Sequence, residues 1–260
     1  MSNDPHITTR APGQFSWVMA HYMLALSEAA YTRATIVSPK TKAQALVDIL
    51  PAAGGDNPRI TVALKGSSSA ADFIQDAKFD RRQPDWASPL DPIEIHEGFF
   101  EDIDSIDVDL AATVVKALNA NPGADIYVTG HSLGGALAVL GAYILQREGL
   151  PIRAVYTFGQ PRVGNSFWAA AYAALLGDRT FRVVNENDIV ARSPGAVLGY
   201  RHSINEIFLP YDGGWCVNPS GWSKAISDAM GLWGAFTQVK DVLVGDHYIE
   251  AYQERMEGLA

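Results

Sequence analysis

The middle of the chain alternates between two kinds of apolar pattern. Strands are predicted at 125–129, 153–158 and 181–185, and helices at 133–147 and 166–176. Strands that alternate with helices form parallel βαβ units, in which helices cover both faces of the sheet. The sequence therefore predicts an α/β fold with a mostly parallel central sheet flanked by helices.

The flanking segments add further elements to this sheet. A turn-rich loop separates the apolar runs 44–50 and 59–65, which predicts a hairpin. Other predicted elements are helices at 15–31, 102–119 and 220–243, and strands at 93–96 and 200–209. The sequence shows no internal repeat and no linker, so we expect one domain over residues 1–260.

Composition excludes several classes of partner. The net charge of −9 and the absence of a basic run argue against binding to nucleic acid. We expect no transmembrane segment, because no stretch approaches 18 uncharged apolar residues. Residues 1–10 lack the order of a secretory signal, which leaves three alternatives open: the protein is cytoplasmic, is secreted by a route not visible in the sequence, or is expressed without its signal. Cys216 is the only cysteine, and we expect it to be a buried thiol.

A five-residue motif, Gly130-His131-Ser132-Leu133-Gly134, lies between a predicted strand and a predicted helix. This strand–turn–helix context is the one that a nucleophile elbow requires, since the serine sits on a sharp turn where flanking side chains would clash. Ser132 is therefore the predicted nucleophile. The backbone N–H of Leu133, at the start of the helix, can donate to a developing oxyanion.

A serine nucleophile needs a histidine base, which in turn needs an orienting carboxylate. Of the two histidines that follow Ser132, we prefer His247 near the C-terminus over His202, which heads a predicted strand. The preferred acid is Asp188, in the polar loop at the carboxyl end of strand 181–185. Its rivals are Asp178, Asp212, Asp241 and Asp246.

Five motifs together resemble those of the class 3 lipases, the family of the filamentous-fungal triacylglycerol lipases. They are VALKGSSS at 62–69, IHEGF at 95–99, VTGHSLGG at 128–135, TFGQPRVGN at 157–165 and NENDIV at 185–190. The order and spacing of these motifs extend the resemblance over nearly the whole chain. It implies an α/β-hydrolase fold with a lid segment.

The resemblance also implies functional roles for individual residues. It implies a triad of Ser132, Asp188 and His247, and an oxyanion role for Ser67. The family has arginine where this chain has Lys65, a change that we expect to affect support of the loop. The single cysteine suggests a bacterial-type member, because the fungal enzymes are disulfide-bonded. The family pattern assigns no role to the aromatic-rich segment 213–243.

These residues predict an acyl-transfer reaction that proceeds in two halves through an acyl-enzyme. We expect a serine carboxylic-ester hydrolase, most simply a triacylglycerol lipase or esterase on apolar esters, with transient contact at a lipid interface. The alternatives are a feruloyl-type or short-chain carboxylesterase, and a non-catalytic interaction protein on the same fold. No cofactor or metal is expected, because the sequence lacks a zinc motif, paired cysteines and a phosphate-binding loop.

A lid is predicted at residues 69–79, directly after the oxyanion candidate Ser67. Phe73 and Ile74 would share one face of a short helix there, and polar residues would take most of the rest. The family places its lid at this position. Opening would expose apolar side chains, so it should be favoured at a lipid surface.

Overall fold

The computed structural model describes residues 15–53, 56–67, 79–186, 188–204, 206–210, 213–218 and 244–259. Within these residues the main sheet has eight strands in the order β1-β2-β3-β6-β7-β8-β9-β10. The strands are β1 (Ile36–Val37), β2 (Gln44–Leu50), β3 (Arg59–Leu64), β6 (Asp125–His131), β7 (Ile152–Phe158), β8 (Thr180–Asn185), β9 (Glu206–Leu209) and β10 (Cys216–Val217).

The centre of this sheet is parallel and its edges are antiparallel. Strands β3, β6, β7, β8 and β9 pair in parallel, whereas β1, β2 and β10 pair antiparallel with their neighbours. A second sheet pairs β4 (Arg81–Arg82) with β5 (Ile95–His96). The predicted mostly parallel α/β sheet is therefore confirmed.

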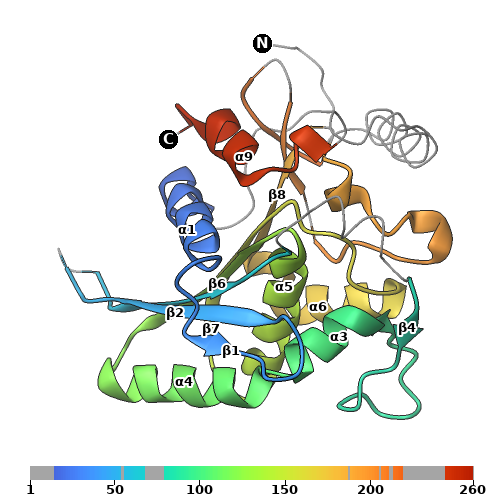
Figure 1. Ribbon diagram of the computed structural model, residues 1–260, viewed down its shortest axis with the longest axis horizontal. Coiled ribbons are helices and arrows are strands. Elements are labelled where there is room, and N and C mark those ends of the chain that lie inside the picture. The colour runs from blue at the N-terminus through green and yellow to red at the C-terminus, as the bar shows by residue number, and fades with distance from the viewer. Residues whose placement is uncertain are drawn as a thin grey trace.

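Helices cover the main sheet on both faces (Figure 1). On one face lie α1 (Trp17–Ala29) and α9 (Ile249–Met256), which share an apolar core with Tyr156 and Phe181. The opposite face carries α3 (Glu97–Asp104), α4 (Asp107–Ala120), α5 (Leu133–Arg147) and α6 (Ser166–Leu176). Residues of β7 alternate between the two faces: Tyr156 packs in the core under α1 and α9, and Val155 packs in the core under α3, α4, α5 and α6. Because helices lie on both faces, the central strands are buried along almost their whole length.

Helix α5 is the most deeply buried helix of the described structure. It is rich in Ala, Gly and Leu, carries no charge before Arg147, and has 11 buried residues out of 15. Small side chains allow it to pack closely against β6 and β7 on one side and α3 on the other. Its first turn follows Ser132 directly, so the packing of α5 fixes the position of the predicted nucleophile.

Two predicted elements differ from the structure. The single helix predicted at 102–119 is in fact α3 and α4, because the Ser105 hydroxyl donates to the Asp102 carbonyl at 2.7 Å and ends the first helix. The strand predicted at 200–209 is confined to β9, since Arg201 forms only an isolated bridge with Gly164.

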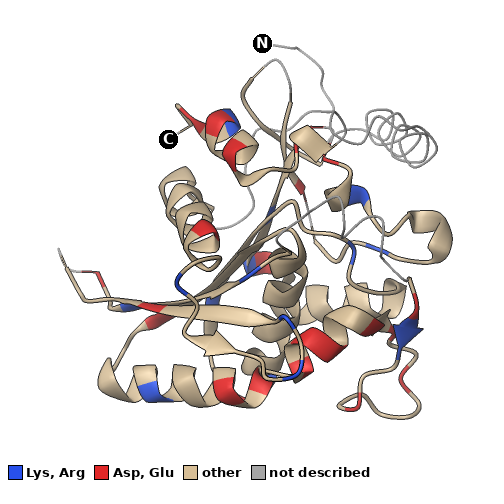
Figure 2. Ribbon diagram, viewed as in Figure 1, with Lys and Arg blue, Asp and Glu red and all other residues tan. Residues whose placement is uncertain are grey.

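Several predictions lie outside the described residues. They include the helix at 220–243 and, except for Phe79, the lid at 69–79. The single domain predicted over residues 1–260 also extends beyond the described ranges, within which the helices pack around one main sheet. Acidic side chains gather on α3, at the start of α4 and on α9 (Figure 2).

Candidate active site

The predicted site residues lie at one edge of the main sheet. Ser67 follows the end of β3, Ser132 follows the end of β6, and Asp188 follows the end of β8. Because these three strands are parallel, their carboxyl ends meet at the same edge. His247 comes from the turn before α9 and reaches the same edge through its contact with Asp188.

Ser132 occupies a strained backbone conformation between β6 and α5. Its φ of 61° and ψ of −132° are rarely adopted by a residue with a Cβ. The turn is too tight for side chains on its neighbours: a Cβ on Gly130 would lie 2.1 Å from the Gly134 carbonyl oxygen, and one on Gly134 would lie 2.2 Å from that of Leu64. The elbow thus requires glycine on both sides of the serine, as the motif predicts.

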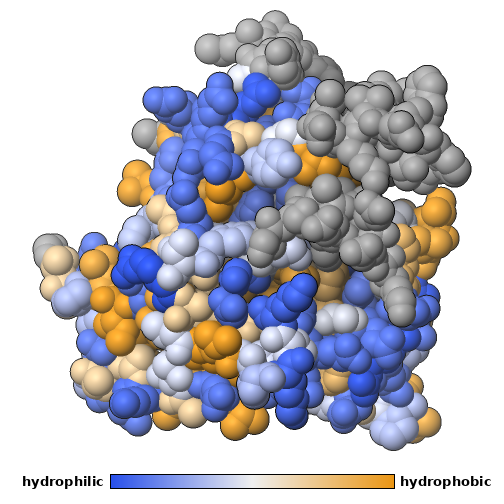
Figure 3. Space-filling model, viewed as in Figure 1, coloured by the Kyte–Doolittle hydropathy of each residue, from blue (hydrophilic) through white to orange (hydrophobic). Residues whose placement is uncertain are grey.

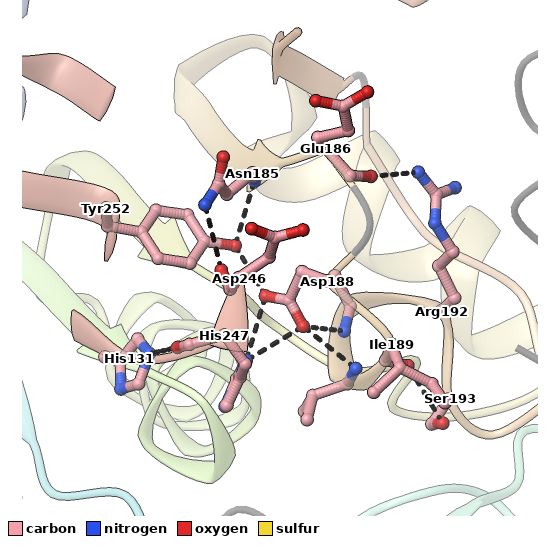
Figure 4. Close-up of polar contacts among 12 residues, drawn as sticks. His131, Asn185, Glu186, Asp188, Ile189, Arg192, Ser193, Asp246, His247 and Tyr252 are labelled. Carbon is pink, nitrogen blue, oxygen red and sulfur yellow. Dashed lines mark hydrogen bonds and ion pairs between the residues drawn. The ribbon is translucent and has the colours of Figure 1, made fainter. Parts of the chain in front are cut away.

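Asp188 and His247 form a fully buried pair (Figure 4). Nδ1 of His247 lies 2.9 Å from Oδ1 and 2.8 Å from Oδ2 of Asp188. The carboxylate also accepts from the backbone N–H of Val190 at 2.9 Å and from the Tyr252 hydroxyl at 2.6 Å. A carboxylate held in this way fixes the orientation of the imidazole and leaves its Nε2 to act as a base.

Opposing effects determine the charge of the Asp188 carboxyl. Burial alone would raise its pKa, but His247 and the hydrogen bonds from His247, Tyr252 and the Ala191 backbone outweigh burial and lower the pKa below the usual value. Asp188 is therefore ionised at neutral pH. An ionised carboxylate can stabilise the imidazolium that forms when His247 takes a proton.

Gly159 makes room for the pair. Its φ is +60°, and a Cβ at this position would lie 2.7 Å from Asp188 Oδ2 and 2.9 Å from His247 Nδ1. The residue before it, Phe158, accepts a hydrogen bond from the Ser132 backbone N–H at 2.9 Å. The end of β7 therefore contacts the predicted nucleophile and both of its predicted partners, which accounts for glycine in the TFG segment.

Two reactive atoms at this edge are buried and have no hydrogen-bond partner among the described residues. They are Oγ of Ser132 and Nε2 of His247. Buried polar atoms are rarely left unpaired unless a function or a ligand uses them. In resting hydrolases such hydrogen bonds are often long and tighten only when substrate binds. The two atoms fit a nucleophile and its base.

The oxyanion candidates belong to two segments that both adjoin Ser132. Leu133 is the first residue of α5, so its N–H has no acceptor within the helix. The segment that carries Ser67 packs against the elbow, since a Cβ on Gly66 would lie 3.3 Å from Cβ of Ser132. Lys65 supports this segment through its backbone N–H and Nζ, which donate to the backbone and side chain of Gln44.

The structure adds three residues that the sequence reasoning missed. Tyr252 donates to Asp188, while His131 hydrogen-bonds the His247 carbonyl and Tyr31 lies 3.4 Å from His131. Tyr252 could have been noticed as one of the buried positions of the amphipathic helix α9. No sequence pattern marks His131 or Tyr31 as a partner of His247. His131 contacts His247 from a distant segment, and Tyr31 reaches it only through His131.

The rival candidates lie elsewhere or have other partners. Nε2 of His202 lies 2.7 Å from the Ala191 carbonyl oxygen, and the exposed Asp178 pairs with Arg179. Asp246 contributes its backbone carbonyl to Asn185. Two further rivals, Asp212 and Asp241, lie outside the described residues.

The described ranges hold no site of two other classes, a metal centre and a membrane-spanning helix. There, no three His, Cys, Asp or Glu side chains are grouped so that they could hold a metal ion. No helix of the same ranges combines the length and apolarity needed to cross a bilayer. Cys216 is buried.

Comparison with known sequences identifies lipases as relatives of this chain. The chain is 38% identical over 161 residues to secreted mono- and diacylglycerol lipase 1 of Fusarium solani, which covers 61% of this chain and 46% of the relative. It is 34% identical over 196 residues to a lipase of Rhizomucor miehei, covering 74% and 53%. The chain thus spans about half the length of these relatives.

Solved structures share the fold. The triacylglyceride lipase of Rhizomucor miehei matches with a TM-score of 0.68 at 26% identity, covering 80% of this chain and 85% of that one. A triacylglycerol lipase whose catalytic centre is described as a serine protease triad matches with a TM-score of 0.66 at 28% identity, covering 81% and 87%. The fold of this chain is therefore the α/β-hydrolase fold.

The expectation of a bacterial-type member is not borne out, because both of these sequence relatives are fungal. The family model described as lipase (class 3) matches residues 61–198, just over half of the chain. This range includes the elbow at Ser132 and the loop that carries Asp188. The chain belongs to the class 3 lipase family.

Proposed function

We propose that this chain is a serine carboxylic-ester hydrolase that cleaves acylglycerols or similar apolar esters through an acyl-enzyme on Ser132. The observation that carries the proposal is the buried Asp188–His247 pair next to a serine held in a strained elbow. The relatives include mono- and diacylglycerol lipases, which supports an acylglycerol substrate.

In the proposed reaction, Nε2 of His247 takes the proton from Ser132 as Oγ attacks the ester carbonyl. Asp188 holds the imidazole and stabilises its charged form. The oxyanion accepts hydrogen bonds from the Leu133 N–H and from Ser67. His247 then gives the proton to the departing alcohol, and water attacks the acyl-enzyme by the same route in reverse to release the acid.

The first test is hydrolysis of soluble p-nitrophenyl esters of increasing chain length, an emulsified triglyceride and methyl ferulate. The parent should prefer acyl esters over ferulate, whereas a preference for ferulate would favour the feruloyl-esterase alternative. Ser132→Ala should abolish hydrolysis, and Ser27→Ala, at a buried serine of α1, should retain it. A parent without any esterase activity would instead support the non-catalytic alternative.

The same assay separates the two histidines. His247→Ala should lose as much activity as Ser132→Ala, because both residues act as one catalytic unit. His202→Ala should cost stability rather than catalysis, since its ring contacts the Ala191 carbonyl. The assignment of the base fails if only the His202 variant is inactive.

We also propose that the site works at a lipid surface. The short helix η3 (Ala196–Leu198) presents an apolar tip, in which Val197 is 85% exposed and Leu198 is 48% exposed. Two guanidinium groups hold this tip in place, because Arg201 donates a hydrogen bond to the Ala196 carbonyl and Arg81 donates one to the Leu198 carbonyl. Apolar surface is visible at the right-hand edge of Figure 3, where the segment with η3 lies in Figure 1.

Apolar side chains on a braced tip can insert into a lipid interface without unfolding the segment that carries them. Since burying each is worth roughly 1.5–3 kcal/mol, Val197→Ser with Leu198→Ser should weaken adsorption to an emulsion by tenfold or more. Leu90→Ser is the matched control, because Leu90 is 93% exposed on another loop. Equal adsorption of both variants would contradict an interfacial role for η3.

The lid at 69–79 remains a proposal, tested in the same assay by Phe73→Ser with Ile74→Ser.

A further inference from the structure

His131 lies next to the predicted nucleophile, yet the proposed mechanism gives it no role. Its ring stacks on the ring of His247, with centroids 4.7 Å apart and an interplanar angle of 28°. Its Nε2 lies 2.7 Å from the backbone carbonyl oxygen of His247 (Figure 4). Because a carbonyl oxygen can only accept, Nε2 of His131 must carry the proton.

This tautomer leaves Nδ1 of His131 as an acceptor. The Tyr31 hydroxyl lies 3.4 Å from it and can donate, because burial raises the pKa of Tyr31 to about 12 and keeps the hydroxyl protonated. The backbone of Gly66 in turn hydrogen-bonds the Tyr31 hydroxyl. A chain of hydrogen bonds therefore runs from the segment next to Ser67 through Tyr31 and His131 to the backbone of His247.

His247 is thus held at two places by different elements. Asp188 fixes Nδ1 of its ring, and His131 fixes its backbone carbonyl and one ring face. A ring held by Asp188 alone could still be displaced with the turn that precedes α9. We propose that His131 is a positioning residue that holds the His247 imidazole in the orientation needed to take the proton from Ser132.

The chemistry of His131 suits this role. Burial and the neighbouring His247 lower the pKa of His131 to about 3, so the ring stays neutral at working pH. When His247 becomes an imidazolium during the reaction, a neutral stacked ring does not repel it. A basic side chain at the same position would oppose that charge.

Two variants separate the stacked ring from the hydrogen bond. His131→Phe keeps a flat ring but loses the donor, whereas His131→Gln places an N–H near the position of Nε2 and loses the ring. Because small displacements of a catalytic group cost up to about 100-fold, His131→Phe should lower kcat by roughly 10- to 100-fold with KM unchanged. His131→Gln should recover most of this loss.

The matched control is His21→Phe. His21 also places Nε2 near a backbone carbonyl, that of Leu259 at 3.1 Å, but lies away from the triad. Its replacement should leave kcat and KM at the parental values. A folded His131→Phe protein with the parental kcat would overturn the proposal.

A second measurement does not depend on catalytic activity. The Nδ1 proton of His247, shared with Asp188, should give a low-field resonance in proton NMR spectra. His131→Phe should shift or broaden this resonance, and His21→Phe should not. If His131→Phe does not fold, Tyr31→Phe decides the question, since an unchanged resonance in that variant contradicts the hydrogen-bond chain.

The inference rests on the proposed function, but the two can fail separately. A parent chain that hydrolyses no ester contradicts the proposed function whatever the resonance shows. A parent that hydrolyses esters, with a resonance and kcat indifferent to His131, contradicts the positioning role alone.

Discussion

Replacing His131 by glutamine should make the folded protein less sensitive to acid. The folded protein holds the pKa of His131 at about 3, because burial and the neighbouring His247 oppose protonation, whereas an unfolded chain has a histidine pKa near 6.5. Between these values the unfolded state binds more protons than the folded state. The free energy of unfolding must therefore fall as the pH falls from 6.5 towards 3.

The size of this effect follows from the two pKa values. Each pH unit inside the window changes the free energy of unfolding by about 1.36 kcal/mol. Between about pH 7.5 and about pH 4.5, His131 should therefore remove roughly 2.7 kcal/mol of stability. Glutamine does not titrate, so the stability difference between the parent and His131→Gln should narrow by this amount as the pH falls.

The assay is urea unfolding followed by tryptophan fluorescence across this pH range. Ser27→Ala serves as the control, because it removes a buried hydroxyl that donates to the Met23 carbonyl at 2.9 Å and does not titrate. At every pH, its free energy of unfolding should be lower than that of the parent by the same amount. Parallel curves for the parent and His131→Gln would refute the claim that His131 is buried and neutral in the folded state.

Three further substitutions test the site. The free energy of unfolding should be about 1 kcal/mol higher for Ser132→Gly than for Ser132→Ala, because glycine accepts the strained φ of 61°. Equal urea midpoints for the two variants would contradict this. Tyr252→Phe removes the 2.6 Å hydrogen bond to Asp188 and should cost about 1–3 kcal/mol of stability with a lower kcat, so a variant with parental stability and kcat would refute that role. Gly134→Ala should lower stability by about 3 kcal/mol, since its Cβ would lie 2.2 Å from the Leu64 carbonyl oxygen, and an unchanged melting temperature would show that the elbow can relax.

The central sheet and the elbow could be predicted because their signals are local. The strand before Ser132 and the helix after it show distinct periodicities, and glycine appears where a Cβ cannot fit. Helices 133–147 and 166–176 begin and end as predicted for this reason. Asp188 could be chosen because polar loops at the carboxyl ends of parallel strands lie together.

Features that depend on contacts between distant segments could not be predicted. His131 contacts a carbonyl 116 positions away, and Tyr252 contacts a carboxylate 64 positions away. No local sequence pattern around either side chain identifies its hydrogen-bond partner. The break between α3 and α4 was missed because the Ser105 hydroxyl competes with the helix for the Asp102 carbonyl, and the apolar pattern continues on both sides.

The packing of α9 on α1 bears on the order in which the protein folds. These two helices lie at opposite ends of the described chain, yet they share one apolar core. The contact between them closes a very long loop, which is a slow and entropically costly step. His247 lies two residues before α9, so esterase activity should return on refolding only after this late docking, whereas the parallel core around α5 can form earlier. A refolding experiment should therefore show tertiary burial around α5 before the recovery of catalysis.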